Sequence, residues 1–123
     1  MERQSGKETM KQIIVMRKDL KMRRGKEIAQ GAHASMKATL ENMNHPNVIQ
    51  WLDGKFAKIC VTVDSLDELM VVYNKAREHN LITAIIEDSG LTEFKGVPTI
   101  TCIAVGPATD EDLEPVTGEL KLY

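Results

Sequence analysis

The chain has 123 residues, a length that fits one compact domain. Hydrophobic residues make up 42% of it and charged residues 28%, enough for a core beneath a solvated surface. No apolar run approaches the roughly 20 residues that span a bilayer, so we expect no membrane partner. Residues 1–10 are polar and lack the apolar centre of a signal peptide. We expect a flexible tail there and a single domain over residues 11–123.

Two cysteines, Cys60 and Cys102, both lie within apolar runs. A buried thiol behaves as a small hydrophobe, and nothing in the sequence indicates secretion. We therefore expect free thiols and a cytoplasmic location. Neither cysteine has a second potential ligand at the spacing found in zinc fingers, and the three histidines form no cluster. We therefore expect no metal site.

The net charge of −2 argues against a general binder of polyanions, but the charge is unevenly placed. The segment over residues 17–26 carries one acid, Asp19, and six basic residues: Arg17, Lys18, Lys21, Arg23, Arg24 and Lys26. A local basic segment on an otherwise acidic chain favours one anionic ligand bound at one site. The alternative is an ordinary solvated loop before a helix.

The elements follow in chain order from a β-branched apolar run at residues 13–16, which predicts a buried first strand. The basic loop leads to a helix over residues 25–44. That helix must end before Pro46, because the residue preceding a proline disfavours helical geometry. A short helix is expected over residues 47–53, and its Trp51 either closes the core or stacks on a base.

A second strand is predicted over residues 58–63. Ser65 and Glu68 then fit a capping box that opens a helix to about residue 80. Two more strands are expected over residues 84–86 and 99–105, separated by a polar loop without a helical pattern.

We expect Gly106-Pro107 to end the fourth strand. The alternation of strands and helices predicts a three-layer α/β fold, with helices on both faces of a mixed four-stranded sheet. Strands joined by helices should be parallel, while the last strand, which follows a loop, fits an antiparallel position.

The long helix over residues 25–44 separates two kinds of residue. Its apolar members recur every three or four positions, so we expect one stripe facing the core: Ile28, Ala32, Met36, Leu40 and Met43. Lys26, Gln30 and His33 fall within an arc of roughly 60° on the opposite side. Such a face can hold a phosphate or polarise a carbonyl, although three polar residues on a helix are more often only solvated.

Small residues crowd the first turns of this helix: Gly25, Ala29, Gly31, Ala32 and Ala34. They allow close approach either to a ligand or to the sheet. The free N–H groups at the helix start also favour an anion.

Asp88 follows the third strand and precedes Ser89-Gly90, which permits a sharp turn. Ligands of open α/β sheets bind outside the carboxyl ends of the strands, where the first strand also delivers the basic loop. A carboxylate there can orient a water or accept a proton, and its alternative role is to cap the turn. We expect Lys26 and Asp88 to meet around a common cleft.

Several short strings together resemble the type 2 peptidyl-tRNA hydrolases, in that family's order over about residues 11–123. They are Arg17-Lys18-Asp19-Leu20-Lys21-Met22, Gly25-Lys26, Ala29-Gln30, His33-Ala34, Asp88-Ser89-Gly90 with Thr92, Thr101 before Gly106-Pro107, and the terminal Gly118-Glu119-Leu120-Lys121-Leu122-Tyr123.

The resemblance implies hydrolysis of the ester between a peptide and tRNA by a homodimer that needs no metal or cofactor. Peptidyl-tRNA is then the partner, with no DNA. The family's functional lysine, histidine, aspartate and threonine match Lys26, His33, Asp88 and Thr101. Gln30 lines the site, and the substrate-binding set is completed by Lys18, Lys21, Arg23, Arg24 and Thr92.

The chain departs from the family's pattern after Asp88, where Leu91 replaces a frequent arginine, and we expect this to weaken one phosphate contact. The following loop is one residue longer, which leaves Thr99 as an alternative to Thr101. We hypothesise that Asp88 positions and deprotonates water with Thr101, that Lys26 stabilises the oxyanion, and that His33 orients its neighbours or shuttles a proton. The alternative function is a non-catalytic module that binds tRNA or another partner.

Overall fold

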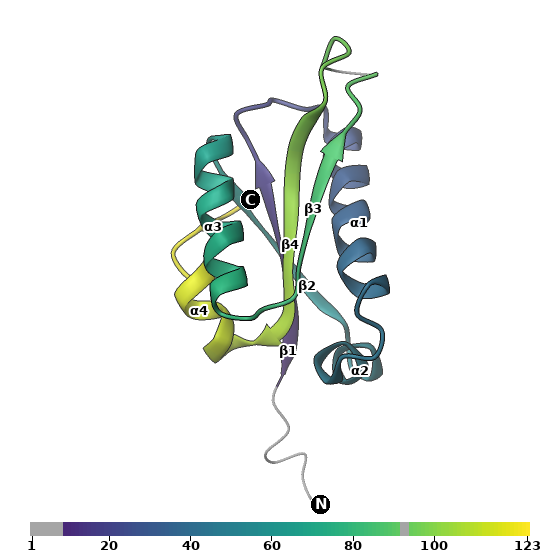
Figure 1. The fold of residues 1–123 in the computed structure, drawn as a ribbon, viewed down its shortest axis with the longest axis vertical. Coiled ribbons are helices and arrows are strands. Elements are labelled where there is room, and N and C mark those ends of the chain that lie inside the picture. The colour runs from purple at the N-terminus through teal and green to yellow at the C-terminus, as the bar shows by residue number, and fades with distance from the viewer. Residues whose placement is uncertain (1–8, 92–93) are drawn as a thin grey trace, which may run out of the picture.

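The computed structural model describes residues 9–91 and 94–123, and within them a five-stranded sheet lies between two pairs of helices (Figure 1). In spatial order the strands are β3 (Thr83–Asp88), β4 (Thr99–Thr109), β1 (Met10–Arg17), β2 (Ala57–Val63) and β5 (Lys121–Leu122). β1 and β2 are parallel, whereas β4 is antiparallel to both of its neighbours. The mixed α/β fold is confirmed, and so is the antiparallel fourth strand.

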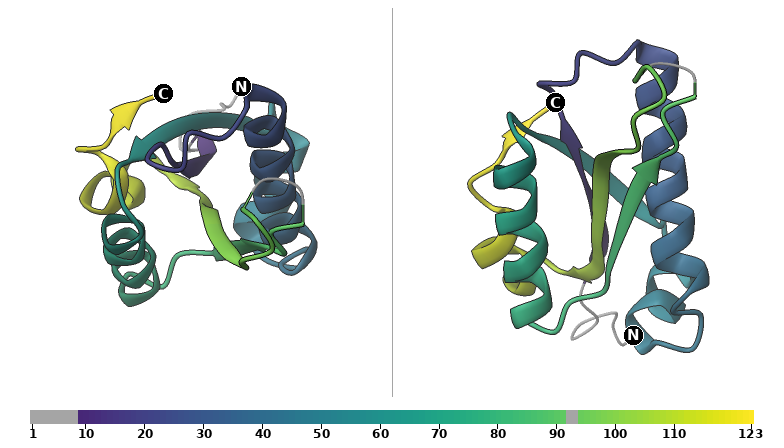
Figure 2. Two further views of the ribbon diagram at one scale, coloured as in Figure 1. Left: turned by 90° about the horizontal axis from the view of Figure 1, so that it is seen from above. Right: turned by 45° about the horizontal axis from the view of Figure 1, so that its top comes forward.

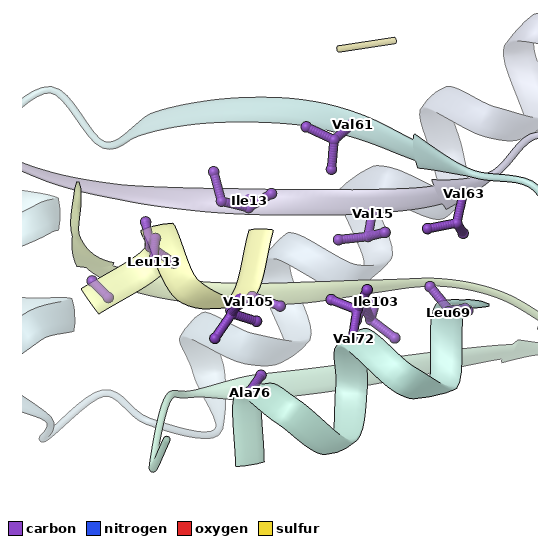
Figure 3. Packing of buried hydrophobic residues seen from close by; sticks show 12 residues of the cluster. Ile13, Val15, Val61, Val63, Leu69, Val72, Ala76, Ile103, Val105 and Leu113 are labelled. Carbon is purple, nitrogen blue, oxygen red and sulfur yellow. The ribbon is translucent and has the colours of Figure 1, made fainter. Parts of the chain in front are cut away.

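The helices cover both faces of the sheet, which gives the three expected layers (Figure 2). α1 (Arg24–Leu40) and α2 (Pro46–Asp53) lie on one face, and α3 (Leu66–Glu78) and α4 (Asp110–Thr117) lie on the other. Each face has its own core cluster. Figure 3 shows the cluster beneath α3, where Leu69 and Val72 of the helix lie close to Ile103 of the sheet.

The prediction of four strands was wrong, because the chain adds β5 at the free edge of β2. Lys121 and Leu122 pair with Thr62 and Val61. A strand of two residues is too short to show an alternating hydrophobic pattern, so the sequence alone could not indicate it.

Two further differences lie near the end of the chain. β4 continues through Gly106-Pro107 to Thr109, and the register with β1 shifts opposite this pair, which accommodates a residue without an N–H. α4 then begins where the sequence shows only an acidic patch. Its signals are a Thr109 side chain that accepts from the N–H of Asp112, and acids in the first turn.

The predicted core stripe of α1 was wrong. Ile28, Met36 and Leu40 are 67%, 56% and 59% exposed. The face toward the sheet instead consists of small and polar residues: Gln30, Gly31, Ala34, Ser35, Ala38 and Thr39. Of the small residues singled out in the sequence, Gly31 and Ala34 therefore serve close packing of helix on sheet, whereas Gly25, Ala29 and Ala32 are exposed. A Cβ added at Gly31 would lie 3.7 Å from side chains of Ile14 and Met16.

Other local predictions are confirmed. The Ser65 hydroxyl accepts from the N–H of Glu68, and the Glu68 carboxylate accepts from the N–H of Asp64. Trp51 is buried and donates to the carbonyl of Ala57, so it belongs to the core. Cys60 and Cys102 are free thiols. Among residues 9–91 and 94–123, no helix is long and apolar enough to cross a membrane.

Val72 and Val71 are neighbours on α3 that test this packing, since Val72 is 5% exposed and Val71 is 61% exposed. We expect Val72→Ala to lower the free energy of unfolding by about 2 kcal/mol, because it removes buried methyl groups and leaves a cavity. Val71→Ala should change it by less than about 0.5 kcal/mol. Urea unfolding measures both, and equal losses would contradict the packing of α3.

Candidate active site

Lys26 and Asp88 meet at the edge of the sheet where the strands β1, β2 and β3 end. Lys26 lies in the first turn of α1, and Asp88 is the last residue of β3. The Lys26 Nζ lies 2.6 Å from Oδ1 of Asp88, and the side chains are 17% and 11% exposed. The expected meeting of the two groups is therefore a feature of the structure.

Two more donors hold the Asp88 carboxylate. Gln30, one turn after Lys26, donates from Nε2 to Asp88 Oδ1 at 3.2 Å. The N–H of Gly90 donates to Oδ2 at 2.8 Å, an Asx-type turn that the φ of +85° at Gly90 permits. Asp88 thus caps its turn, which was the alternative role, and also forms an ion pair with Lys26.

The charge of Asp88 follows from these contacts. The hydrogen bond from Lys26 is the main reason that the pKa of Asp88 lies below its usual range, with Gly90 and Gln30 adding to the effect and burial opposing it. Asp88 therefore remains a carboxylate throughout the neutral range. Its share of stability is present above the pKa of the unfolded group and is lost as the pH falls through the lower folded value.

Thr101 orients Gln30 from beneath. Its hydroxyl donates to Oε1 of Gln30 at 2.9 Å, which leaves the amide nitrogen of Gln30 to face Asp88. Thr101 is the extra residue at a register shift between β3 and β4, because Ile86 pairs with Cys102 and Glu87 with Ile100. Such a bulge re-aims a side chain.

The structure separates the two candidate threonines. Thr101 is fully buried beside Gln30, whereas the Thr99 hydroxyl donates to the carbonyl of Val97. Buried Cys102 lies next to this network, and burial raises the pKa of its thiol to about 12. A thiolate nucleophile at Cys102 is therefore excluded at neutral pH.

His33 is exposed on the same side of α1, about 10 Å further along the helix axis than Lys26. Among the described residues no hydrogen bond joins it to Lys26, Gln30 or Asp88. The structure thus brings together four of the expected site residues and leaves His33 outside their contacts, so its role stays a prediction.

The basic loop opens toward solvent beside α1. Lys18, Lys21, Arg23 and Arg24 are exposed. Arg17 behaves differently, because it pairs with Asp19 at 2.7 Å and donates to the carbonyl of Ile100 at 3.0 Å. Arg17 therefore braces the loop, a role that the sequence did not reveal. The predicted substrate-binding residue Thr92 lies outside the described residues.

The family model described as peptidyl-tRNA hydrolase PTH2 matches residues 10–123. The chain belongs to this family.

Curated relatives of the same name extend the likeness over nearly their whole length. The peptidyl-tRNA hydrolase of Sulfurisphaera tokodaii is 46% identical over 118 residues, covering 91% of this chain and 97% of the relative. The peptidyl-tRNA hydrolase of Methanocaldococcus jannaschii is 43% identical, covering 92% and 99%. That of Methanothermobacter thermautotrophicus is 40% identical, again covering 92% and 99%.

In this member of the peptidyl-tRNA hydrolase family, the part of the chain that the structure describes contains no group of three or more His, Cys, Asp or Glu residues placed to hold a metal ion. The charged groups at the site are two side chains, the ammonium of Lys26 and the carboxylate of Asp88.

Gly90 and Gly96 provide a matched test of how the turn holds Asp88. Both have positive φ, but a Cβ at Gly90 would overlap the backbone of Val97, whereas a Cβ at Gly96 meets nothing within 4 Å. We expect each alanine variant to lose about 1–2 kcal/mol of stability to the backbone strain, and Gly90→Ala to lose more because of the overlap with Val97. Only Gly90→Ala should also displace the Asp88 carboxylate and lower kcat about tenfold. Thermal unfolding and peptidyl-tRNA cleavage measure the two effects, and equal kcat values in both variants would refute the coupling.

Proposed function

We propose that this chain hydrolyses the ester bond of peptidyl-tRNA at the Lys26–Asp88 pair and releases free tRNA and peptide. The single observation that carries the site is the 2.6 Å contact between an ammonium and a carboxylate from residues 62 positions apart. Membership of the peptidyl-tRNA hydrolase family supports the choice of substrate.

Ester hydrolysis needs a positioned water and positive charge where the oxyanion develops. The water oxygen forms a bond to the ester carbonyl carbon, and the carbonyl oxygen becomes negative in the tetrahedral intermediate. The bond from carbon to the ribose oxygen then breaks, and the proton lost by the water passes to that oxygen. Lys26 stabilises the oxyanion, a contribution worth roughly 100- to 1000-fold in rate for a preorganised donor.

Asp88 orients the attacking water in this scheme. Its lowered pKa makes it a weak base, so it accepts a hydrogen bond from the water and directs the proton onward rather than retaining it. Gln30 and Gly90 keep the carboxylate in one orientation. Thr101 acts indirectly, because its buried hydroxyl fixes the orientation of the Gln30 amide.

The tRNA is bound by the exposed basic residues that precede and begin α1. Lys18, Lys21, Arg23 and Arg24 contact its phosphates, and His33 extends the same face for a proton transfer or a further RNA contact. Thr92 completes the set as a proposed substrate contact. Because translation supplies peptidyl-tRNA in the cytoplasm, we place the enzyme there.

Cleavage of peptidyl-tRNA without added metal tests the assignment. Lys26→Ala and Asp88→Asn should each lower kcat at least about 100-fold, because each removes one charge of the pair. Lys37→Ala is the matched control, since Lys37 lies on the same helix, is exposed and donates to the carbonyl of Ile85. It should retain full activity.

Circular dichroism and thermal unfolding establish that the variants are folded. If the Lys26→Ala and Asp88→Asn proteins are folded and keep the wild-type kcat, the assignment of the active site to this pair is wrong. Salt-sensitive tRNA binding by the wild type without turnover would instead favour the non-catalytic module.

A second copy of the chain is the proposed occupant of the exposed apolar face of α1 and α2. This face comprises Ile28, Met36, Leu40, Met43, Ile49 and Leu52. Large apolar side chains gathered on adjacent helices are typical of an interaction surface, and an uncharged patch can pair with itself about a two-fold axis.

Light scattering coupled to size exclusion tests the homodimer. Met36→Glu should convert a dimer to a monomer, because it places a charge within the apolar face. Val71→Glu, on the opposite face and 61% exposed, should leave the dimer intact. A wild-type monomer at micromolar concentration would contradict the proposal.

A further inference from the structure

The first turn of α1 is held from both edges of the sheet. Lys26 contacts Asp88 at the end of the edge strand β3. The next residue, Glu27, accepts a hydrogen bond of 2.6 Å from the hydroxyl of Tyr123, which directly follows the other edge strand, β5. Consecutive helical residues point about 100° apart, so the two contacts act on different sides of the helix.

The side of α1 that faces Tyr123 has little other support. The helix packs mainly over β4 and β3. A groove of about 810 Å³ separates it from β2 and is lined by residues that include Ile14, Met16 and Cys60. The N-cap residue Arg23 gives no side-chain cap to the helix. The hydrogen bond from Tyr123 to Glu27 therefore bridges a gap that core packing leaves open.

Tyr123 is itself well placed to act as an anchor. Its N–H donates to the carbonyl of Cys60 at 3.0 Å, which extends the pairing of β5 with β2. Figure 2 shows the C-terminal segment returning to the end of the molecule where α1 begins. The Lys18 ammonium of the basic loop lies 6.0 Å from the centre of the tyrosine ring. The Glu27 hydrogen bond raises the pKa of Tyr123, so the hydroxyl keeps the proton that it donates.

We propose that Tyr123 is a positioning residue for the hydrolysis, and that it fixes the rotation of the first turn of α1 through Glu27 and so aims the Lys26 amine at the reacting ester. This proposal rests on the proposed function of Lys26. Without the tether, the turn can rotate toward the groove, and the ammonium moves relative to Asp88 and the carbonyl oxygen. Small displacements of this kind reduce the rate of the chemical step without weakening substrate binding.

Steady-state cleavage of peptidyl-tRNA by the full chain tests the tether. Tyr123→Phe keeps the ring beside Lys18 and the backbone pairing but loses the hydroxyl. We expect kcat to fall about fivefold and KM to stay within about twofold. Glu27→Ala should give the same loss, and the double variant should be no worse than either single variant. Glu27→Gln retains an acceptor for the hydroxyl and should restore kcat.

Tyr73→Phe is the matched control, because it is the same substitution at the only other tyrosine, whose hydroxyl accepts from Arg77 on α3. It should leave kcat and KM unchanged. In that background, tyrosinate absorbance follows Tyr123 alone, and Glu27→Gln should lower its pKa toward the ordinary value.

The outcomes distinguish this proposal from the function on which it rests. A kcat for Tyr123→Phe equal to wild type, losses that multiply in the double variant, or a rise in KM alone would overturn the positioning role. Full activity of Lys26→Ala would instead overturn the proposed function, whatever Tyr123 does.

Discussion

The close approach of α1 to the sheet is the constraint on which the site depends. Gly31 lies against Ile14 and Met16, and Ala34 and Ala38 are fully buried beside it. A side chain larger than alanine at any of these positions would push the helix away from the strands. Two long-range contacts would then be lost together, the one between Gln30 and Thr101 and the one between Lys26 and Asp88. The packing of small residues and the chemistry of the site are therefore one requirement on the sequence.

The direction of the hydrogen bonds determines which groups at the site face the negative charge of Asp88. The Thr101 hydroxyl donates to the amide oxygen of Gln30, so the amide nitrogen must point at Asp88, where only a donor is favourable. Lys26 and Gly90 add two more donors to the same carboxylate. A buried polar network is stable only when its members are satisfied, and this one directs the donors of Lys26, Gln30 and Gly90 toward a single negative charge. That charge, in turn, holds the ammonium at the edge of the sheet.

Much of this could be predicted from residue patterns, and the remainder depended on contacts distant in sequence. Strand order along the chain, the Ser65 cap and the meeting of Lys26 with Asp88 follow from local signals and from the rule that strand ends converge. Periodicity placed Ile28 and Met36 in the core because it cannot distinguish an apolar face that packs on the sheet from one that stays exposed on the surface. The bulge at Thr101 and the short β5 arise from strand pairing, which no single segment encodes. The choice between Thr99 and Thr101 depended on that bulge.

The location of Tyr123 has a practical consequence for handling the protein. Its backbone continues an edge strand, and its ring lies next to the basic loop and the start of α1. An affinity tag fused after Tyr123 would emerge among the residues proposed to bind RNA. β1, by contrast, begins at the opposite end of the sheet (Figure 1). Purification handles and surface-immobilisation chemistry are therefore better attached ahead of β1, at the end of the sheet away from the Lys26–Asp88 pair.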